Sequence, residues 1–186
     1  MLIPSNICDQ LSDEEMVSRA LGDMDYFNCI VLRYGDRLAR YIKRISGADE
    51  QEVEDVLQDS FIKVWKNLNE YRVELKLSSW LYRIVHNVTV SKWRKKKTMR
   101  HVLTENVEDI TKVIYEDSSS IEESEINIIQ SLYQLKPRYK DVLVLKYFEG
   151  MNYEEISDVL KIPEGTVAVR LNRARKQMKE LLNNKA

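Results

Sequence analysis

Tyr153–Lys179, YEEISDVLKIPEGTVAVRLNRARKQMK, is the stretch that decides the fold, because its spacing, turn residues and charge agree. At its start, Asn152 with Glu155 three residues later predicts a capping box that opens an amphipathic helix. Lys161–Gly165 then predicts a tight turn. In this turn proline fixes φ, glycine allows a sharp reversal, and Ile162 plugs the space between two helices.

A second helix begins directly after this turn, and its two faces differ in character. One face is apolar and predicted to be buried: Val167, Leu171, Ala174, Met178, Leu181 and Leu182. The other begins with small residues and continues into cations: Ala168, Val169, Asn172, Arg173 and Lys176, flanked by Arg170 and Arg175. Small residues let a backbone approach base edges, and arginine binds guanine or phosphate. We therefore predict a helix-turn-helix whose second helix enters the major groove; a helical hairpin with a solvated basic face is the alternative.

The composition is that of a helical protein that could divide into two small domains. The chain has 186 residues, of which 44% are hydrophobic, which is enough to bury a core. Only five glycines and three prolines, with 32% charged residues, favour an all-α chain. No apolar run approaches the ~20 residues that span a bilayer, and the N-terminus lacks a signal pattern. We expect a cytoplasmic protein without membrane insertion.

The two cysteines and two histidines do not form a metal-binding pattern. Cys8 and Cys29 lack a CxxC spacing, so we expect reduced thiols rather than a disulfide or a metal site. His86 and His101 have no ligand partners at useful spacing. We expect neither a metal nor a cofactor.

The net charge of −1 is distributed very unevenly. Residues 1–91 carry a net −4 and residues 92–101 carry +6, whereas residues 102–131 carry −7 and residues 132–186 carry +4. Two basic patches are thus separated by an acidic segment. Because local patches set the affinity for phosphate, this distribution favours nucleic-acid binding.

The first third of the chain predicts successive amphipathic helices. Ser12 with Glu15 forms a capping box before the first, a longer helix runs from about Tyr26 to Ile45, and Val53–Leu68 has the cleanest helical spacing. The outer face of this last helix combines acids, an amide and one exposed apolar residue: Asp55, Gln58, Asp59 and Ile62. Such a face suits a protein partner, and an ordinary solvated helix face is the alternative.

Helical periodicity lapses over Tyr71–Leu77, which predicts a loop, and Ser78 or Ser79 is predicted to cap the next helix. The outer stripe of that helix is polar and runs into a basic segment: Arg83, Asn87, Ser91, Lys92, Arg94, Lys95, Lys96 and Lys97. These cations can track a phosphate backbone, and neighbouring aromatic rings can stack on exposed bases. The aromatic candidates are Tyr71, Trp80, Tyr82 and Trp93. Packing at the start of the helix is the alternative for Trp80 and Tyr82.

The acidic segment His101–Ser120 has no strong periodicity, and we expect a flexible linker there. The helical pattern returns at Ile121, breaks at Lys136–Arg138, and stops at Glu149 and Gly150 before the helix-turn-helix. We therefore predict two small helical bundles, residues 1–100 and 122–186, joined by an acidic linker at 101–121.

Four blocks, in this order and separation, resemble the extracytoplasmic-function sigma factors, the minimal two-domain group of the bacterial sigma-70 family. They are DVLQDSFIKVWKNL (55–68), SSWLYRIVHNVTVSKWRKKK (78–97), LKPRYKDVLVLKYFEGMNYEEISDVL (135–160) and IPEGTVAVRLNRARKQMKELL (162–182). The resemblance covers nearly the whole chain. It implies a region 2 bundle, a region 4 helix-turn-helix, and a protein that delivers core RNA polymerase to promoters and opens DNA without hydrolysing nucleotide.

The resemblance also implies roles for individual positions. Asp55, Gln58, Asp59 and Ile62 would meet the clamp helices of the largest polymerase subunit. Arg83, Asn87, Ser91, Trp93 and the basic run from Lys92 would meet the upstream edge of the −10 element, with Trp80 nearby, and the loop with Tyr71, Arg72 and Lys76 would hold an extruded base. Ala168, Val169, Asn172, Arg173 and Lys176 would read the −35 element, with Thr166, Arg170 and Arg175 on phosphate. The flap of the second polymerase subunit and an anti-sigma factor are further implied partners, and the linker would thread toward the RNA exit channel.

Two positions depart from the family pattern. Ala168-Val169 stands where a basic and then a small polar residue is common, and Ser91 stands four residues after Asn87 where an aspartate is usual. An apolar pair can contact thymine methyl groups but cannot hydrogen-bond guanine, so we predict a −35 preference weighted toward A and T.

Two other classes of function remain open. A free-standing repressor or activator would also carry a helix-turn-helix, but it would normally dimerise, and no heptad seam is present. An enzyme is disfavoured, because the sequence has no P-loop, HExxH, GxSxG or Cys/His cluster.

Overall fold

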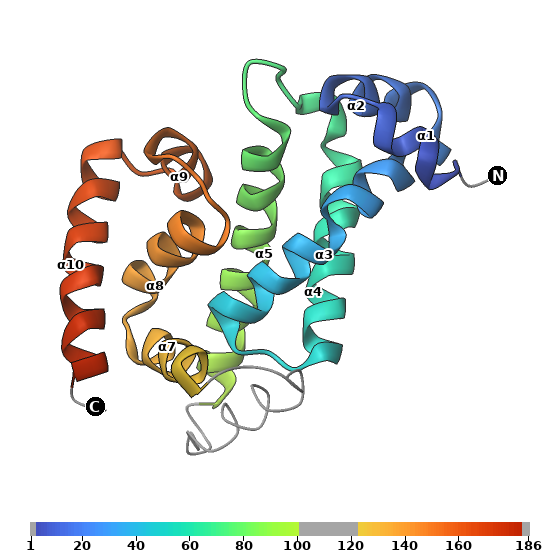
Figure 1. The fold of residues 1–186 in the computed structure, drawn as a ribbon. Coiled ribbons are helices and arrows are strands. Elements are labelled where there is room, and N and C mark those ends of the chain that lie inside the picture. Colours follow the sequence, from blue (N-terminus) through green and yellow to red (C-terminus); the bar gives the residue numbers. More distant parts are fainter. Residues whose placement is uncertain (1–2, 101–122, 184–186) are drawn as a thin grey trace.

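Every regular element is helical within residues 3–100 and 123–183, the part of the chain that the computed structural model describes (Figure 1). The N-terminal elements are α1 (Ser5–Gln10), α2 (Asp13–Gly22), η1 (Met24–Tyr26), α3 (Phe27–Ser46), α4 (Glu50–Lys66), η2 (Leu68–Glu70) and α5 (Leu77–Arg100). The C-terminal elements are α7 (Glu123–Gln134), α8 (Pro137–Leu143), the π-helical turn η3 (Val144–Phe148), α9 (Tyr153–Leu160) and α10 (Glu164–Asn183). The prediction of an all-α fold is confirmed.

The predicted capping boxes are present at two helix starts. At α2, the Glu15 amide donates to Ser12 Oγ at 3.1 Å and the Ser12 amide donates to Glu15 Oε2 at 2.8 Å. Asn152 and Glu155 exchange the same two bonds at the start of α9, at 2.8 and 2.7 Å. Each box satisfies two amides that have no partner inside the helix, which fixes where the chain turns into the helix.

The N-terminal helices enclose one apolar core. Helices α3, α4 and α5 pack on one another, and α2 lies against α3. The predicted stripes are inside: Ile30, Leu38, Ile42, Val56, Val64, Leu81 and Val85 are fully buried. Tyr41 of α3 and Tyr82 of α5 meet edge to face at the centre, with ring centroids 5.0 Å apart. Aromatic pairs in this geometry add to the stability that burial of their area provides.

The C-terminal helices build a second core around the helix-turn-helix. Helix α10 packs on α8, α9 and α7, and the buried residues of its inner face are Val167, Leu171 and Ala174. Opposite them lie Val142, Leu145 and Ile156, which are fully buried. The predicted inner stripe of the second helix is therefore confirmed over its first three turns, while Met178 and Leu181 are half-buried.

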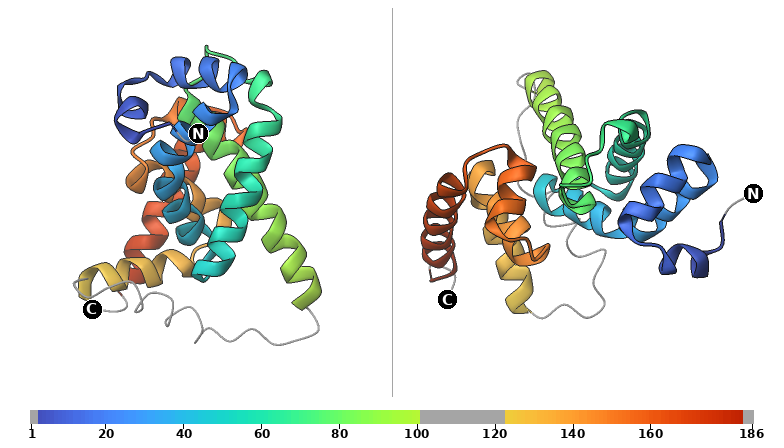
Figure 2. Two further views of the ribbon diagram at one scale, coloured as in Figure 1. Left: turned by 90° about the vertical axis from the view of Figure 1, so that its right-hand side faces the viewer. Right: turned by 90° about the horizontal axis from the view of Figure 1, so that it is seen from above.

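The two groups of helices lie against each other rather than apart. Helix α9 packs along α5, and α8 and η3 contact α3 (Figures 1 and 2). The expected linker at 101–121 lies outside the described residues. The contact between the two halves was not foreseen from the sequence, because it joins residues about 70 to 105 positions apart along the chain.

Cys8 and Cys29 are joined by a disulfide, so the expectation of reduced thiols is wrong. The two residues are 21 positions apart, but α1 packs on α3 and brings their Cα atoms to 5.0 Å, a separation that a disulfide can bridge. Arg33 fastens the same corner, because its Nη2 donates to the carbonyls of Cys8 at 2.7 Å and Leu11 at 2.6 Å. The spacing of Cys8 and Cys29 in the sequence does not indicate that they lie close together in the fold.

The turn of the helix-turn-helix is built differently from the prediction. Lys161 adopts the left-handed conformation with φ 52° and ends α9, donating from its amide to Ser157 O. Gly165 instead lies in the first turn of α10 without a positive φ, so the predicted glycine reversal is wrong. The Pro163 carbonyl oxygen accepts hydrogen bonds from the amides of Thr166 and Val167 at the start of α10. Ile162 is half-buried and packs on the core, as expected.

The serine cap predicted for α5 is also wrong. The helix begins at Leu77, and the Trp80 amide already donates to Lys76 O at 3.2 Å. Ser79 is therefore buried inside the first turn, where its hydroxyl has no partner. Leu77 and Trp80 are both buried, and their burial favours a helix that begins one or two residues earlier than one capped by Ser78 or Ser79.

Candidate nucleic-acid interface

The outer face of α10 presents the predicted reading residues to solvent. Val169 is 48% exposed, and Asn172, Arg173, Arg175 and Lys176 are exposed. The small and flanking positions Thr166, Ala168 and Arg170 are half-buried. The amides of Thr166 and Val167 donate to Pro163 O at 2.8 and 3.1 Å, which anchors the N-terminal turn that a major groove would receive.

The basic run after Ser91 is helical, since α5 continues to Arg100. Asn87 and Ser91 are exposed on this helix, Arg83 is half-buried, and the side chain of Lys97 lies outside those described. Two of the cations already have acidic partners on α4: Lys92 Nζ lies 3.5 Å from Asp55 Oδ2, and Lys96 pairs with Glu52. These two pairs partly neutralise the mutual repulsion within the basic run. The side chains of Arg94 and Lys95 are exposed.

The loop before α5 forms a hollow of about 650 Å³ lined by residues 71–75. The Tyr71 hydroxyl donates to Leu75 O at 2.7 Å, and the Leu75 amide donates to Arg72 O at 3.0 Å, so the loop closes on itself. Burial raises the pKa of Tyr71, which keeps its hydroxyl protonated as a donor. Arg72 and Lys76 are exposed at the rim.

Two of the four aromatic candidates are packing residues. Trp80 is 5% exposed and packs on Tyr71 with ring centroids 5.6 Å apart, while Tyr82 is fully buried. Both rings lie in the interior, which favours the packing alternative over stacking on an exposed base. Trp93 is half-buried and Tyr71 is partly exposed.

The outer face of α4 carries its predicted candidates together. Asp55, Gln58 and Asp59 are exposed, and Ile62 is 46% exposed one turn further along. An apolar side chain beside carboxylates on one helix face has the composition of a protein-binding surface, whereas carboxylates would repel phosphate.

An apolar groove that the sequence analysis did not single out lies between α7, η3 and α10. It has a volume of about 430 Å³ and is lined by Ile128, Leu132, Leu143, Tyr147, Phe148 and Met178, among others. Tyr147 is 58% exposed and Phe148 39%, and exposed apolar surface of this kind marks protein-binding sites. The available sequence signal was the aromatic pair Tyr147-Phe148 at the end of the helical pattern that stops at Glu149 and Gly150.

Metal-binding clusters and membrane-spanning helices are both absent from the part of the chain that the structure describes. Residues 3–100 and 123–183 contain no cluster of three or more side chains that could hold a metal ion. No helix within those ranges is long and apolar enough to cross a membrane.

Comparison with known proteins places these surfaces in a family. Residues 30–98 match the family model for sigma-70 region 2, and residues 126–178 match the model for sigma-70, region 4. The chain is 34% identical over 173 residues to the ECF RNA polymerase sigma factor SigW of Bacillus subtilis, an alignment that covers 88% of this chain and 92% of that protein. The chain belongs to the ECF sigma factors.

Other comparisons agree with this assignment. The RNA polymerase sigma-H factor of Pseudomonas aeruginosa is 32% identical over 185 residues, covering 93% of the chain and 95% of that factor. CnrH, solved in complex with the cytosolic domain of CnrY, superposes with a TM-score of 0.69 at 25% identity, covering 92% of this chain and 97% of CnrH. The sigma factor RpoE of Bartonella quintana, solved with the anti-sigma factor NepR, has the same fold, with a TM-score of 0.69 at 20% identity over 84% of this chain and 96% of RpoE.

The function of this ECF sigma factor is to direct promoter-specific initiation of transcription, and a free-standing repressor or activator is not favoured. Helices α3 to α5 carry region 2, and α7 to α10 carry region 4. Sigma factors are initiation factors without catalysis of their own, which accords with the expectation that the chain is not an enzyme.

Proposed function

We propose that this sigma factor binds core RNA polymerase through α4 and through the groove of region 4. Asp55, Gln58, Asp59 and Ile62 would meet the clamp helices of the largest subunit, and the groove between α7, η3 and α10 would take the flap of the second subunit. The exposure of Ile62 beside three polar side chains supports the first contact, and the exposed Tyr147 and Phe148 support the second. The site of action would be the cytoplasm, where the polymerase and DNA are.

The −10 element would be met by α5 and its preceding loop. Asn87 and Ser91 lie on the exposed stripe, the basic run follows the backbone, and the hollow at residues 71–75 would receive an extruded base. Extruding a base costs a few kcal/mol, and binding it in a pocket offsets that cost. Region 2 would therefore trap a base that has already left the stack, with no nucleotide hydrolysis.

The −35 element would be read by the outer face of α10. Val169 is exposed where a thymine methyl can be contacted, Asn172 and Arg173 follow one turn later, and Arg175 would contact phosphate. The proposed domain limits are 1–100 for region 2, 101–121 for the linker and 122–186 for region 4. CnrH and RpoE were solved with anti-sigma partners, and an anti-sigma factor is a proposed partner here too.

The observation that carries this proposal is the placement of two separate cation-bearing helices, α5 and α10, on a chain that also has an acidic and apolar face on α4. Footprinting on a promoter that the chain activates tests it. We expect protection of both the −35 and −10 elements only when core polymerase is added. Strong protection of a palindrome by the chain alone would contradict the proposal and favour a repressor.

A further inference from the structure

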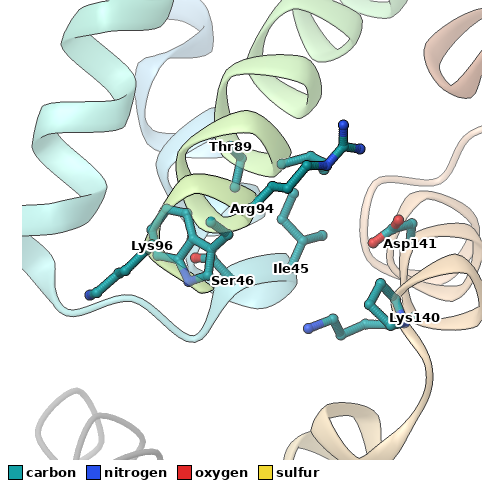
Figure 3. A pocket seen from close by; sticks show the side chains of 10 residues that line it. Ile45, Ser46, Thr89, Arg94, Lys96, Lys140 and Asp141 are labelled. Carbon is teal, nitrogen blue, oxygen red and sulfur yellow. The ribbon is translucent and has the colours of Figure 1, made fainter. Parts of the chain in front are cut away.

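A cavity lies where the end of α3, the second half of α5 and the start of α8 meet (Figure 3). It has a volume of about 460 Å³, within the range of about 300–1,000 Å³ that is usual for small-molecule sites. Its apolar walls are Ile45, Val90, Trp93 and Pro137. The cavity therefore has the size and much of the lining of a binding site for a small organic molecule.

Two charged side chains that face this cavity are almost completely buried. Lys140 is 8% exposed and Asp141 is 9% exposed. Figure 3 shows both side chains directed from α8 toward Ile45 of α3. Charged residues are rarely buried to this extent unless they are paired. Glu149 follows that rule, because its side chain is 3% exposed and lies 3.2 Å from Arg44 Nη1.

Lys140 and Asp141 do not follow it. The Lys140 Nζ lies 5.0 Å from the centroid of the Tyr133 ring, and this contact gives its N–H groups no acceptor. Asp141 is attracted by Lys140 and by Arg170, but its carboxylate has no ion pair or hydrogen bond with any residue that the structure describes. Burial raises the pKa of Asp141 to about 7 and lowers the pKa of Lys140. Buried polar groups without partners are uncommon, and this pair needs an explanation.

The other polar groups around the cavity have roles elsewhere. The hydroxyls of Ser46 and Thr89 donate to backbone carbonyl oxygens one turn earlier in their own helices, at 2.6 and 2.8 Å. Lys96 points away from the cavity and pairs with Glu52 of α4 (Figure 3). Arg94 is exposed. The chemistry that the cavity offers is therefore one ammonium and one carboxylate beside apolar walls.

A ligand that complements this cavity carries both kinds of charge. Its carboxylate can accept hydrogen bonds from Lys140, and its ammonium can donate to Asp141. A plain carboxylic acid would be repelled by Asp141, and a plain amine by Lys140. Charge-assisted hydrogen bonds in a site shielded from water are stronger than those on an open surface. An apolar body on the same ligand would pack on the walls of the cavity.

We propose that the cavity between α3, α5 and α8 binds a small zwitterion with an apolar body, an α-amino acid with a large apolar side chain. Lys140 holds the carboxylate of the ligand and Asp141 holds its ammonium. Ile45, Val90 and Trp93 hold its side chain. Binding of such a ligand is independent of the polymerase and promoter contacts proposed above, so a failure to bind it would leave those contacts untouched.

The first test compares a zwitterion with its two halves. L-Phenylalanine, phenethylamine and 3-phenylpropionate share one ring and differ only in their charged groups. Titration of the full chain, followed by calorimetry or NMR, should give L-phenylalanine an affinity roughly tenfold or more above that of either other compound, since each half loses a hydrogen bond to a charged group. Failure of all three to bind, or equal affinity for L-phenylalanine and one of its halves, would overturn the proposal.

The second test changes one charge at a time. Asp141→Asn should lower the affinity for L-phenylalanine roughly tenfold and leave that for 3-phenylpropionate unchanged or higher. Lys140→Met, which keeps an apolar side chain against Tyr133, should lower the affinity for L-phenylalanine similarly and leave that for phenethylamine unchanged or higher. Glu180→Gln, an exposed change near the end of α10, is the matched control, and melting temperatures check folding. Equal effects on all three compounds would indicate a structural role for the two charges and overturn the assignment.

The third test locates the ligand. The chain has three tryptophans, Trp65, Trp80 and Trp93, and of these Trp93 lines the cavity. We expect the indole N–H signal of Trp93, assigned with Trp93→Phe, to shift in the NMR spectrum as L-phenylalanine is added. The signals of Trp65 and Trp80 should stay in place. A shift of either of these two signals without a shift of Trp93 would place the ligand elsewhere and overturn the site.

Discussion

At the scale of single residues, burial changes what a side chain can do. His86 has no ligand partner at useful sequence spacing, and it is 8% exposed with its Nδ1 hydrogen-bonded to the Tyr41 hydroxyl at 2.9 Å. Trp80 and Tyr82 match the stacking pattern but are interior. Composition and spacing identify the residue types at a site, and burial decides which of them face solvent.

Burial lowers the pKa of His86 to about 4 from an ordinary 6.5. The unfolded chain therefore takes up a proton first as the pH falls, so the stability associated with neutral His86 is complete above pH 6.5 and is lost progressively toward pH 4. We expect the free energy of unfolding to fall by about 2 kcal/mol more between pH 7 and pH 5 in wild type than in His86→Gln. Urea unfolding at both pH values measures this, and equal falls would contradict it.

Val169 tests how α10 reads DNA. Its exposed methyl groups can contact thymine, so Val169→Ala should weaken binding of holoenzyme to a promoter with A and T in the −35 element by roughly fivefold and relax the preference at one position. Arg175→Ala is the matched comparison, because loss of a phosphate contact should weaken all sequences alike and reduce the salt dependence. Selection from randomised promoters measures both, and recovery of G at every position would contradict the prediction.

At the scale of elements, the periodicity of apolar residues predicted which segments are helices and which face of each is buried. It did not predict how the helices begin, end and turn into one another. The helix predicted over Tyr26–Ile45 is α3 within one residue at each end, and both capping boxes are as predicted. The π-helical turn η3, the early start of α5 and the left-handed Lys161 escaped prediction. The early start of α5 follows from the burial of Leu77 and Trp80 in the core, and local propensity does not encode such packing.

The disulfide between α1 and α3 gives a prediction for this corner of the fold. Closing a loop of about 20 residues should stabilise the folded chain by about 3 kcal/mol, mainly by restricting the unfolded chain. Thermal unfolding of wild type should therefore shift to lower temperature when dithiothreitol is added. Cys8→Ser/Cys29→Ser should unfold at that lower temperature with or without the reductant. An unchanged melting temperature of wild type in reductant would contradict the prediction.

Helix α5 and its preceding loop give a prediction about DNA opening. Asn87→Ala and changes within the 71–75 hollow remove contacts that only an unpaired base would make, so they should reduce open-complex formation more than closed-complex binding. Permanganate footprinting of unpaired thymines, compared with gel-shift binding at low temperature, separates the two steps. Lys63→Ala, an exposed change on α4, serves as a control. Equal loss in both steps would argue against a role in melting.

At the scale of the whole molecule, the family and the division into region 2 and region 4 could be reached from sequence, because four motif blocks recur in order. Spacing also placed the polar site residues of α4, α5 and α10 on outer faces, whereas Trp80 of α5 is interior. The docking of one region on the other could not be reached, since Glu149, Arg44 and Tyr82 have no shared motif and meet only in the folded chain.

This chain converts core polymerase into an enzyme that starts transcription at specific promoters. Run-off transcription with purified core polymerase and a promoter library, with and without the chain, measures it directly. We predict discrete transcripts from a subset of promoters sharing −35 and −10 elements, seen only when the chain is present. Failure of the chain to associate with core polymerase, or the same RNA products with and without it, would contradict the claim.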